Sequence, residues 1–189
     1  MAAEARAVPL ERWLDRPPDA ALVEVVRGEL VVKLVGGNPH HYLARRLAEE
    51  FERQWPGTVA TAPGNWALEL THDGRVVTGR MPDVLVDGAA LLTAPVFTGV
   101  PDAVVEVWSP GNGAAARWEK RLEYRRAGLP ALLEAYLADD GEVHLDWLVP
   151  DREHGASWLS LATASGSRSL VVPAPRPFEV RPDDLLRMP

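Results

Sequence analysis

Short segments of alternating or helically spaced apolar residues run along the whole chain. Val23–Val35 alternates around Arg27-Gly28, which predicts a β-hairpin with those two residues in the turn. His40–Gln54 carries a large apolar residue at every fourth position of its central part, which predicts an amphipathic helix that ends before Pro56-Gly57. A second, more polar helix is predicted at Ala114–Ala127, because a glycine follows at the position favoured just past a helix end.

The remaining apolar runs predict strands that are separated by turns rich in Gly, Pro and Asp. Residues 1–19 are rich in Ala, Pro and charge, and we expect a flexible or helical extension there with a short helical piece around Leu10–Leu14. No internal repeat and no linker divides the sequence, so residues 1–189 are predicted to form one α+β domain with a strand-rich centre and two main helices. The predicted strands are Val59–Leu70, Met81–Val86, Ala103–Trp108, Ala131–Leu137 and Val143–Val149, followed by a terminal hairpin of Ser157–Leu161 and Ser169–Val172.

Composition narrows the class of protein. Hydrophobic residues make up 47% of the 189 positions, enough to bury a core, and no apolar run approaches the roughly 18 residues that a membrane span needs. The first residues lack the charged-then-apolar pattern of a signal peptide, and the absence of cysteine excludes disulfides and thiolate metal sites. A net charge of −7 argues against a strongly basic nucleic-acid-binding surface but leaves local basic contacts open. We expect a soluble cytoplasmic protein that does not associate with membranes.

Two carboxylates stand inside apolar strands, where an unpaired charge is costly. Asp83 opens the segment MPDVLV, and Glu106 lies in the middle of AVVEVW. If these two segments pair antiparallel across the loop between them, Asp83 lies near Glu106. Two carboxylates at one end of a sheet predict a site for a hard cation, since Mg²⁺ usually takes one or two carboxylates and keeps several waters.

The basic residues are strongly biased toward arginine. Of the 20 lysine and arginine residues, only Lys33 and Lys120 are lysines. In such a chain a lysine can mark a position that needs a compact ammonium whose pKa is adjustable. Two lysines are too few to decide this point from the sequence.

The string E-V-x-S-P from Glu106, followed by K-x-x-x-Y-x-x-x-G from Lys120 and preceded by the Pro-Asp of Asp83, resembles the Uma2 family (DUF820) of restriction-endonuclease-like proteins. That family belongs to the PD-(D/E)XK nuclease superfamily. The resemblance extends from the EVVRGELVV hairpin to the terminal PRPFEVRPDDLL. It implies a restriction-endonuclease-like core, which is a central mixed β-sheet with flanking helices and an N-terminal β-hairpin.

The resemblance also implies a chemistry, the metal-dependent hydrolysis of nucleic-acid phosphodiester bonds. Asp83 and Glu106 would hold Mg²⁺ or Mn²⁺, with the backbone carbonyl of Val107 as a third ligand, and Lys120 would be the basic residue of the signature. The superfamily's usual lysine position, two residues after the acid, is Trp108 here, so the lysine is expected on the following helix. The implied partners are DNA and a second copy of the chain in a homodimer. Auxiliary site residues would be Glu29, His41 and Tyr124.

Each site residue also has a purely structural interpretation. Asp83 can cap a turn, as Asp after Pro commonly does. Glu106 can form an ion pair with an arginine, and Lys120 can be a solvated helix residue paired with Glu119 or Glu123. His40-His41 can be a solvated helix start. Core packing is the expected role of Trp66, Trp108, Trp118 and Trp147, and either DNA contact or an ordinary exposed face is expected for Arg121, Arg125 and Arg126.

Two rival functions therefore remain beside the endonuclease. One is a non-catalytic module that keeps the nuclease fold to bind nucleic acid or protein, which the acidic net charge and the alanines at Ala114–Ala116, where relatives often have an acid, would suit. The other is a metal-dependent hydrolase acting on a different substrate. Two observations distinguish these three hypotheses. One is whether Asp83, Glu106 and Lys120 converge in one cleft, and the other is which phosphodiesters the protein cleaves.

Overall fold

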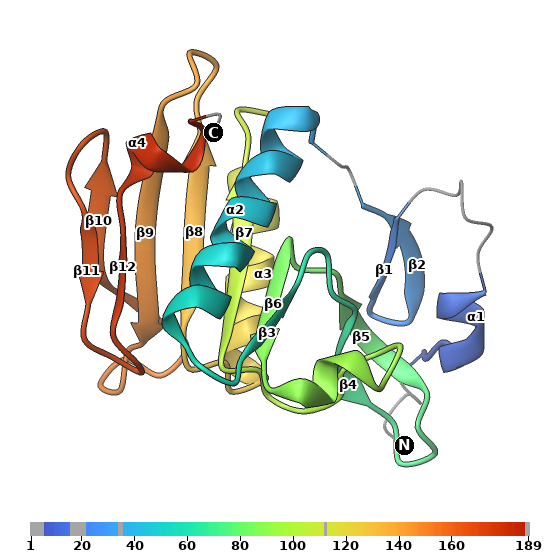
Figure 1. The fold of residues 1–189 in the computed structure, drawn as a ribbon. Coiled ribbons are helices and arrows are strands. Elements are labelled where there is room, and N and C mark those ends of the chain that lie inside the picture. The colour runs from blue at the N-terminus through green and yellow to red at the C-terminus, as the bar shows by residue number, and fades with distance from the viewer. Residues whose placement is uncertain (1–5, 16–21, 34–35, 112, 188–189) are drawn as a thin grey trace.

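A mixed six-stranded sheet forms the centre of the molecule (Figure 1). The computed structural model describes residues 6–15, 22–33, 36–111 and 113–187. Only β7 and β8 run parallel, and every other neighbouring pair in this sheet is antiparallel. The strand order is β10 (Trp158–Ser165), β9 (Val143–Pro150), β8 (Leu132–Leu137), β7 (Ala103–Trp108), β6 (Val84–Asp87) and β3 (Val59–Thr61).

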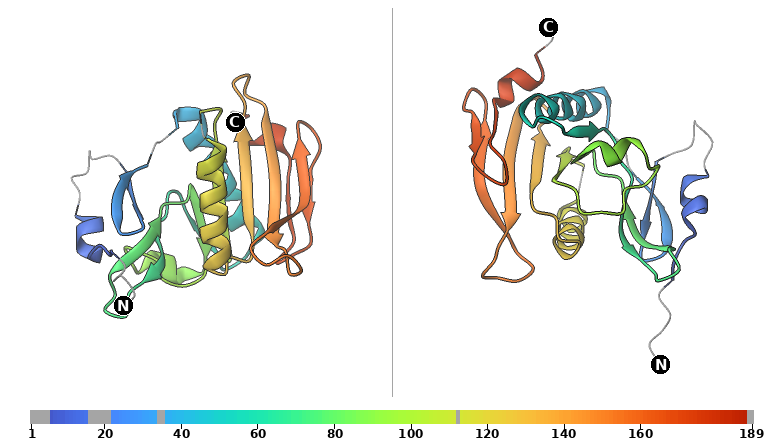
Figure 2. Two further views of the ribbon diagram at one scale, coloured as in Figure 1. Left: turned by 180° about the vertical axis from the view of Figure 1, so that it is seen from behind. Right: turned by 60° about the horizontal axis from the view of Figure 1, so that its bottom comes forward.

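The two long helices cover opposite faces of this sheet. Helix α2 (Asn38–Gln54) crosses the front, and α3 (Ala114–Arg126) lies behind, where the reverse view shows it clearly (Figure 2). Both helices were expected, and α2 begins two residues earlier than predicted because Pro39 fits the first helical turn. The predicted α+β class with a central mixed sheet and flanking helices is confirmed.

Alternation along β7 decides which side chains meet which helix. Val105 and Val107 point into the core beneath α2, together with Leu47. Val104 points to the opposite face and packs with Tyr124 of α3. Because side chains alternate along a strand, Glu106 faces α3 in the middle of an otherwise apolar strand.

A smaller four-stranded sheet stands beside the central one, in the order β2 (Glu29–Val32), β1 (Val23–Val26), β5 (Val76–Arg80) and β4 (Trp66–Leu70). The predicted hairpin is confirmed as β1 and β2, and its turn residues Arg27 and Gly28 both have positive φ. The predicted hairpin end at residues 34–35 lies outside the described residues. The helical piece α1 (Leu10–Leu14) is also confirmed, and its Trp13 is fully buried against this sheet. Parts of the expected extension, residues 1–5 and 16–19, lie outside the described residues.

Two strand predictions in the first half were wrong. The run Val59–Leu70 is not one strand, because Pro63-Gly64 interrupts it and sends β3 and β4 into different sheets. Strand β5 was missed altogether, although it pairs with β1 and β4 and carries Arg80 into the site. The predicted loop Asp87–Val100 also contains a short 3₁₀ turn, η1 (Ala89–Leu92).

The C-terminal region also differs from the prediction. The expected hairpin between Ser157–Leu161 and Ser169–Val172 does not form, since β10 pairs with β9 instead. The segment expected as a Pro-rich tail contributes β12 (Phe178–Val180), which pairs with β11 (Leu170–Val172), and a short helix α4 (Pro182–Leu185). Phe178 explains this pairing, because its ring stacks on Phe51 of α2 and completes the core.

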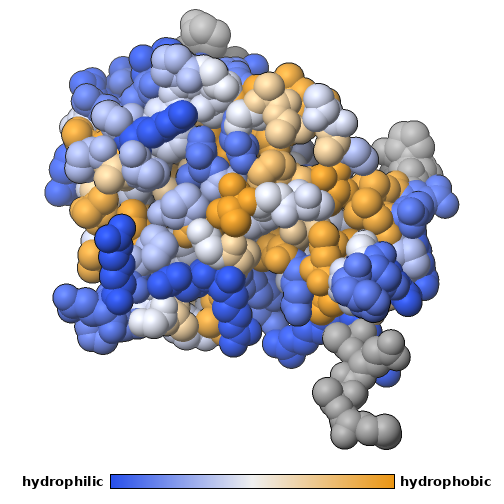
Figure 3. Space-filling view, turned by 90° about the horizontal axis from the view of Figure 1, so that it is seen from below, coloured by the Kyte–Doolittle hydropathy of each residue, from blue (hydrophilic) through white to orange (hydrophobic). Residues whose placement is uncertain are grey.

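The surface seen from below mixes hydrophilic and hydrophobic side chains (Figure 3). Among the described residues, no helix is both long and apolar enough to cross a membrane.

Candidate active site

Strand pairing brings the two predicted carboxylates together. β6 and β7 pair antiparallel with Val84 opposite Val105, so Asp83 and Glu106 are the next residues of the two segments beyond this pair. The link is completed by the backbone amide of Val107, which donates a hydrogen bond of 2.8 Å to Oδ2 of Asp83. The expected antiparallel pairing is thus present, and it anchors Asp83 to the strand that carries Glu106.

Glu106 is held by two side chains of α3. The Lys120 ammonium lies 3.0 and 3.1 Å from its two carboxylate oxygens, and the hydroxyl of Tyr124, one helical turn further on, donates to Oε1. Only 2% of the Glu106 surface is exposed. Lys120 is therefore not the solvated helix residue of the structural interpretation, and the partner of Glu106 is a lysine rather than an arginine.

Asp83 is held from the opposite side, by the N-terminal hairpin and by α2. Lys33, just past the end of β2, places its ammonium 2.6 Å from Oδ1, and Nε2 of His40 lies 3.2 Å from the same oxygen. The ring of His40 is buried against Gly36, where any added Cβ would collide with the ring. Both lysines of the chain thus lie at the two carboxylates, a convergence that the sequence left undecided.

A third buried carboxylate belongs to the same network and was missed. Glu24 of β1 lies 3.2 Å from the Lys120 ammonium and 2.8 Å from the Arg80 guanidinium, and it accepts the backbone amide of Met81. The Arg80 guanidinium also donates a hydrogen bond to the carboxylate of Glu123 on α3. The sequence did contain a signal for Glu24, because this residue lies between two valines in a predicted strand, as Glu106 does.

Burial and nearby charges shift the pKa values of Asp83 and Glu106 in opposite directions. Burial by itself would raise the pKa of Asp83, but the hydrogen bond from His40 and the charge of Lys33 outweigh it and hold that pKa well below its usual range. Burial raises the pKa of Glu106, and the nearby charge of Asp83 adds to this. The pKa of Lys120 is raised despite burial, because Glu106 and Glu24 surround its ammonium. The surroundings therefore favour the carboxylate form of Asp83 and the ammonium form of Lys120.

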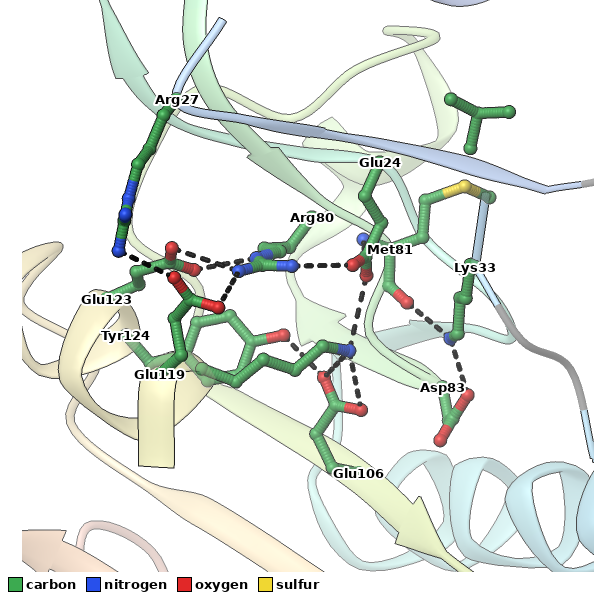
Figure 4. A network of polar contacts seen from close by, with 12 residues as sticks. Glu24, Arg27, Lys33, Arg80, Met81, Asp83, Glu106, Glu119, Glu123 and Tyr124 are labelled. Atoms are coloured by element: carbon green, nitrogen blue, oxygen red, sulfur yellow. Dashed lines mark hydrogen bonds and ion pairs between the residues drawn. The ribbon is translucent and has the colours of Figure 1, made fainter. Parts of the chain in front are cut away.

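These side chains line one cavity. Figure 4 shows Glu24, Asp83 and Glu106 converging from three different strand segments, with Lys33 on one side and Arg80 on the other. The cavity has a volume of about 340 Å³ and opens between the hairpin, the start of α2 and the exposed side of α3. Its lining includes Glu24, Lys33, His40, Arg80, Asp83, Glu106, Val107, Glu119 and Lys120.

The model of the Uma2 family, described as "Putative restriction endonuclease", matches residues 10–169. The chain belongs to the Uma2 family. The matched range contains every member of the buried network, from Glu24 to Tyr124.

A solved relative shares the fold. A crystal structure described as a putative nuclease belonging to DUF820, from Anabaena variabilis, superposes with a TM-score of 0.61 and covers 89% of each chain. Sequence identity is 15%, so this likeness establishes that the two chains share a fold. No curated protein matches the chain.

The remaining predicted site residues of this Uma2 chain fall in different places. Val107 lines the cavity, and Tyr124 contacts Glu106. Glu29 is 64% exposed and pairs with Arg6, so Glu24 of the neighbouring strand takes the place expected for it. His41 is exposed, and the contact to Asp83 belongs to His40.

Two expectations outside the site are also decided. Trp66, Trp108 and Trp147 are buried as predicted, whereas Trp118 is 60% exposed on the outer side of α3. Arg121 is not an exposed DNA contact, because its guanidinium forms a two-pronged ion pair with the fully buried Glu134.

The donor chemistry fits a hard cation only in part. Within the described ranges, no three His, Asp or Glu side chains are arranged as a ready-made metal cage. Asp83 and Glu106 supply oxygen donors in an accessible cavity, which is the number of carboxylates that Mg²⁺ commonly takes when substrate and water complete its shell. The two carboxylates therefore match the number that a magnesium-type ion commonly takes from a protein.

Proposed function

We propose that this chain is a Mg²⁺- or Mn²⁺-dependent endonuclease that hydrolyses nucleic-acid phosphodiester bonds, with DNA as the substrate. The observation that carries the proposal is the meeting of Asp83, Glu106 and Lys120 at one cavity. Membership of a family described as a putative restriction endonuclease supports the same class of reaction.

The side chains have distinct roles in this proposal. Asp83 and Glu106 hold the ion, with the carbonyl of Val107 as a third ligand, and the ion supplies a water that is activated at neutral pH and neutralises charge on the phosphate. Lys120, fixed by Glu106 and Glu24, stabilises the negative charge that develops on the scissile phosphate. Tyr124 positions Glu106 by donating its hydroxyl hydrogen.

The finer parts of the proposal concern partners and location. Two copies of the chain would place two sites on the two strands of a duplex, which is the reason to propose a homodimer. The surface is acidic overall, so contacts to phosphate have to come from local cations such as Lys33, Lys120 and Arg126. A cytoplasmic location remains a prediction.

Cleavage of plasmid DNA with Mg²⁺ or Mn²⁺, against a chelator control, tests the function. Asp83→Asn and Glu106→Gln keep the size of each side chain and remove its charge, and we expect each to lower the rate at least about 10³-fold, since metal catalysis contributes several kcal/mol. Glu29→Gln removes an exposed carboxylate of β2 that is not part of the cavity lining, and it is the matched control. The proposal fails if both site variants cut as well as the wild type. Parallel assays with RNA and a small phosphodiester define the substrate.

One observation favours a second function, a non-catalytic binding module. Lysine ammoniums pair with both Asp83 and Glu106, so the two carboxylates have cationic partners within the chain. Under this alternative the wild type binds DNA or protein without cutting, and Asp83→Asn leaves binding intact. Gel-shift assays beside the cleavage assay separate the two functions.

A further inference from the structure

Lys33 occupies an unusual place for a side chain of the N-terminal hairpin. Its ammonium lies 2.6 Å from Oδ1 of Asp83 and 2.5 Å from the carbonyl oxygen of Met81, and only 9% of the side chain is exposed. Oδ1 of Asp83 thus has the charge of an ammonium beside it, while Oδ2 accepts a hydrogen bond from the amide of Val107.

The three buried cations of the network differ in how firmly they are held. Lys120 has two carboxylate partners, Glu106 and Glu24, and Arg80 likewise bridges Glu24 to Glu123. Among the described contacts, Lys33 pairs with one carboxylate, Asp83, through a flexible four-carbon stem. Lys33 is therefore the cation of the site that can leave at the lowest cost.

We propose that Lys33 is a resident counter-cation that a divalent metal has to displace from Asp83. The inference rests on the proposed function and deepens it. An ammonium and a dication cannot both lie on Oδ1 of Asp83, since their charges repel at that distance. Once displaced, the ammonium remains at the rim of the cavity, where a nucleic-acid phosphate is its natural new partner.

This exchange couples metal binding to substrate binding. Without nucleic acid, displacement of Lys33 leaves its ammonium without the carboxylate that had neutralised it. The metal therefore binds weakly. With a phosphate present, the released ammonium is paired again and the metal binds more tightly. By linkage, the metal strengthens nucleic-acid binding by the same factor.

Calorimetric titration of Mn²⁺ into the protein without nucleic acid tests the proposal. Lys33→Met keeps the unbranched shape of the side chain, one atom shorter, and removes its charge, so we expect it to bind Mn²⁺ at least about tenfold more tightly than the wild type. Arg27→Gln, which removes an equal charge from the exposed turn of the same hairpin, is the matched control and should bind like the wild type. The rise in melting temperature with Mn²⁺ gives a second readout that is independent of activity.

The outcomes separate the inference from the proposed function. If Lys33→Met binds Mn²⁺ no more tightly than the wild type, Lys33 does not compete with the metal and the inference is wrong. If neither protein binds Mn²⁺, with or without a DNA duplex, both the inference and the metal-dependent function are wrong. Lys33→Gln retains a donor for the Met81 carbonyl, and it replaces Lys33→Met in the same test if that variant does not fold.

Discussion

The ammonium of Lys120 lies 3.0 Å from one carboxylate oxygen of Glu106 and 3.1 Å from the other, although the two residues belong to a helix and a strand that are separated by a turn. Parallel pairing of β7 with β8 requires a crossover, and α3 is that crossover. The helix therefore returns over the face of β7 on which Glu106 stands. This arrangement places a lysine beside the acid without the usual lysine two positions later, where Trp108 lies.

Removal of the Lys120 charge should separate catalysis from metal binding. We expect Lys120→Met to lower cleavage about 10²–10³-fold, the usual effect of losing one group that stabilises transition-state charge. Its Mn²⁺ affinity should not fall, because Asp83 and Glu106 remain. Single-turnover cleavage and calorimetry on the same variant check both parts. Undiminished cleavage would remove Lys120 from the mechanism.

Replacement of Glu24 should make stability depend less on acid pH. Burial opposes ionisation of Glu24, but the charges of Lys120 and Arg80 outweigh it and hold its pKa below the ordinary value of 4.5. The unfolded state therefore binds more protons in acid, so Glu24 stabilises the native state above pH 4.5 and this contribution is lost as pH falls through the lowered native pKa. Glu24→Gln should be about 3 kcal/mol less stable than the wild type near neutral pH, with the difference narrowing in acid.

Urea unfolding at a neutral and an acidic pH measures this difference. Glu29→Gln, on the neighbouring strand, removes an exposed carboxylate and should change stability little at either pH. A Glu24→Gln deficit that is equal at both pH values would contradict the prediction.

Arg121 should matter for stability and not for the metal. Its guanidinium pairs with Glu134, which is fully buried on β8 beside Glu106 and outside the cavity lining. Arg121→Met leaves that carboxylate buried with the Tyr136 hydroxyl but without its cationic partner, and we expect a loss of about 3 kcal/mol in the free energy of unfolding. Mn²⁺ affinity of the folded variant should equal that of the wild type. Altered affinity would mean that the metal region extends to β8.

Replacement of a buried tryptophan should lower stability much more than replacement of an exposed one. Trp147 is fully buried and packs near Phe51, whereas Trp118 is 60% exposed. Trp147→Ala should cost about 3–5 kcal/mol through loss of packing and the cavity it leaves. Trp118→Ala should change stability by no more than about 0.5 kcal/mol. Chemical unfolding of both variants checks this, and a large effect of Trp118→Ala would show that its ring makes stabilising contacts.

Much of the candidate site could be predicted because its signals are local. A charge within a valine-rich strand stands out without any structure, as Asp83 and Glu106 did. The pairing of their strands was expected because one loop connects the two segments. Lys120 was predicted from the spacing of a family signature. That spacing reflects a helix that returns over the strand carrying the acid.

The predictions that failed concern residues whose partners are distant in the sequence. Glu24 has the same local pattern as Glu106, but its role depends on β1 reaching β5, and β5 itself was missed. The choice of His40 over His41 depends on the rotation of α2 about its axis, which the core residues of that helix decide. Trp118 and Trp147 look alike in sequence, and only the packing of α3 leaves one of them in solvent.

The sequence by itself determined the α+β class, the main helices, most of the central strands and the position of two carboxylates among apolar residues, because alternation, helical spacing and an acid among valines are properties of neighbouring residues. The tertiary structure alone decided that both lysines of the chain meet those carboxylates. In the sequence, Lys33 precedes the segments that contain Asp83 and Glu106, and Lys120 follows them. Only the pairing of the hairpin with β5, together with the return of α3 over β7, brings their charges into one cavity.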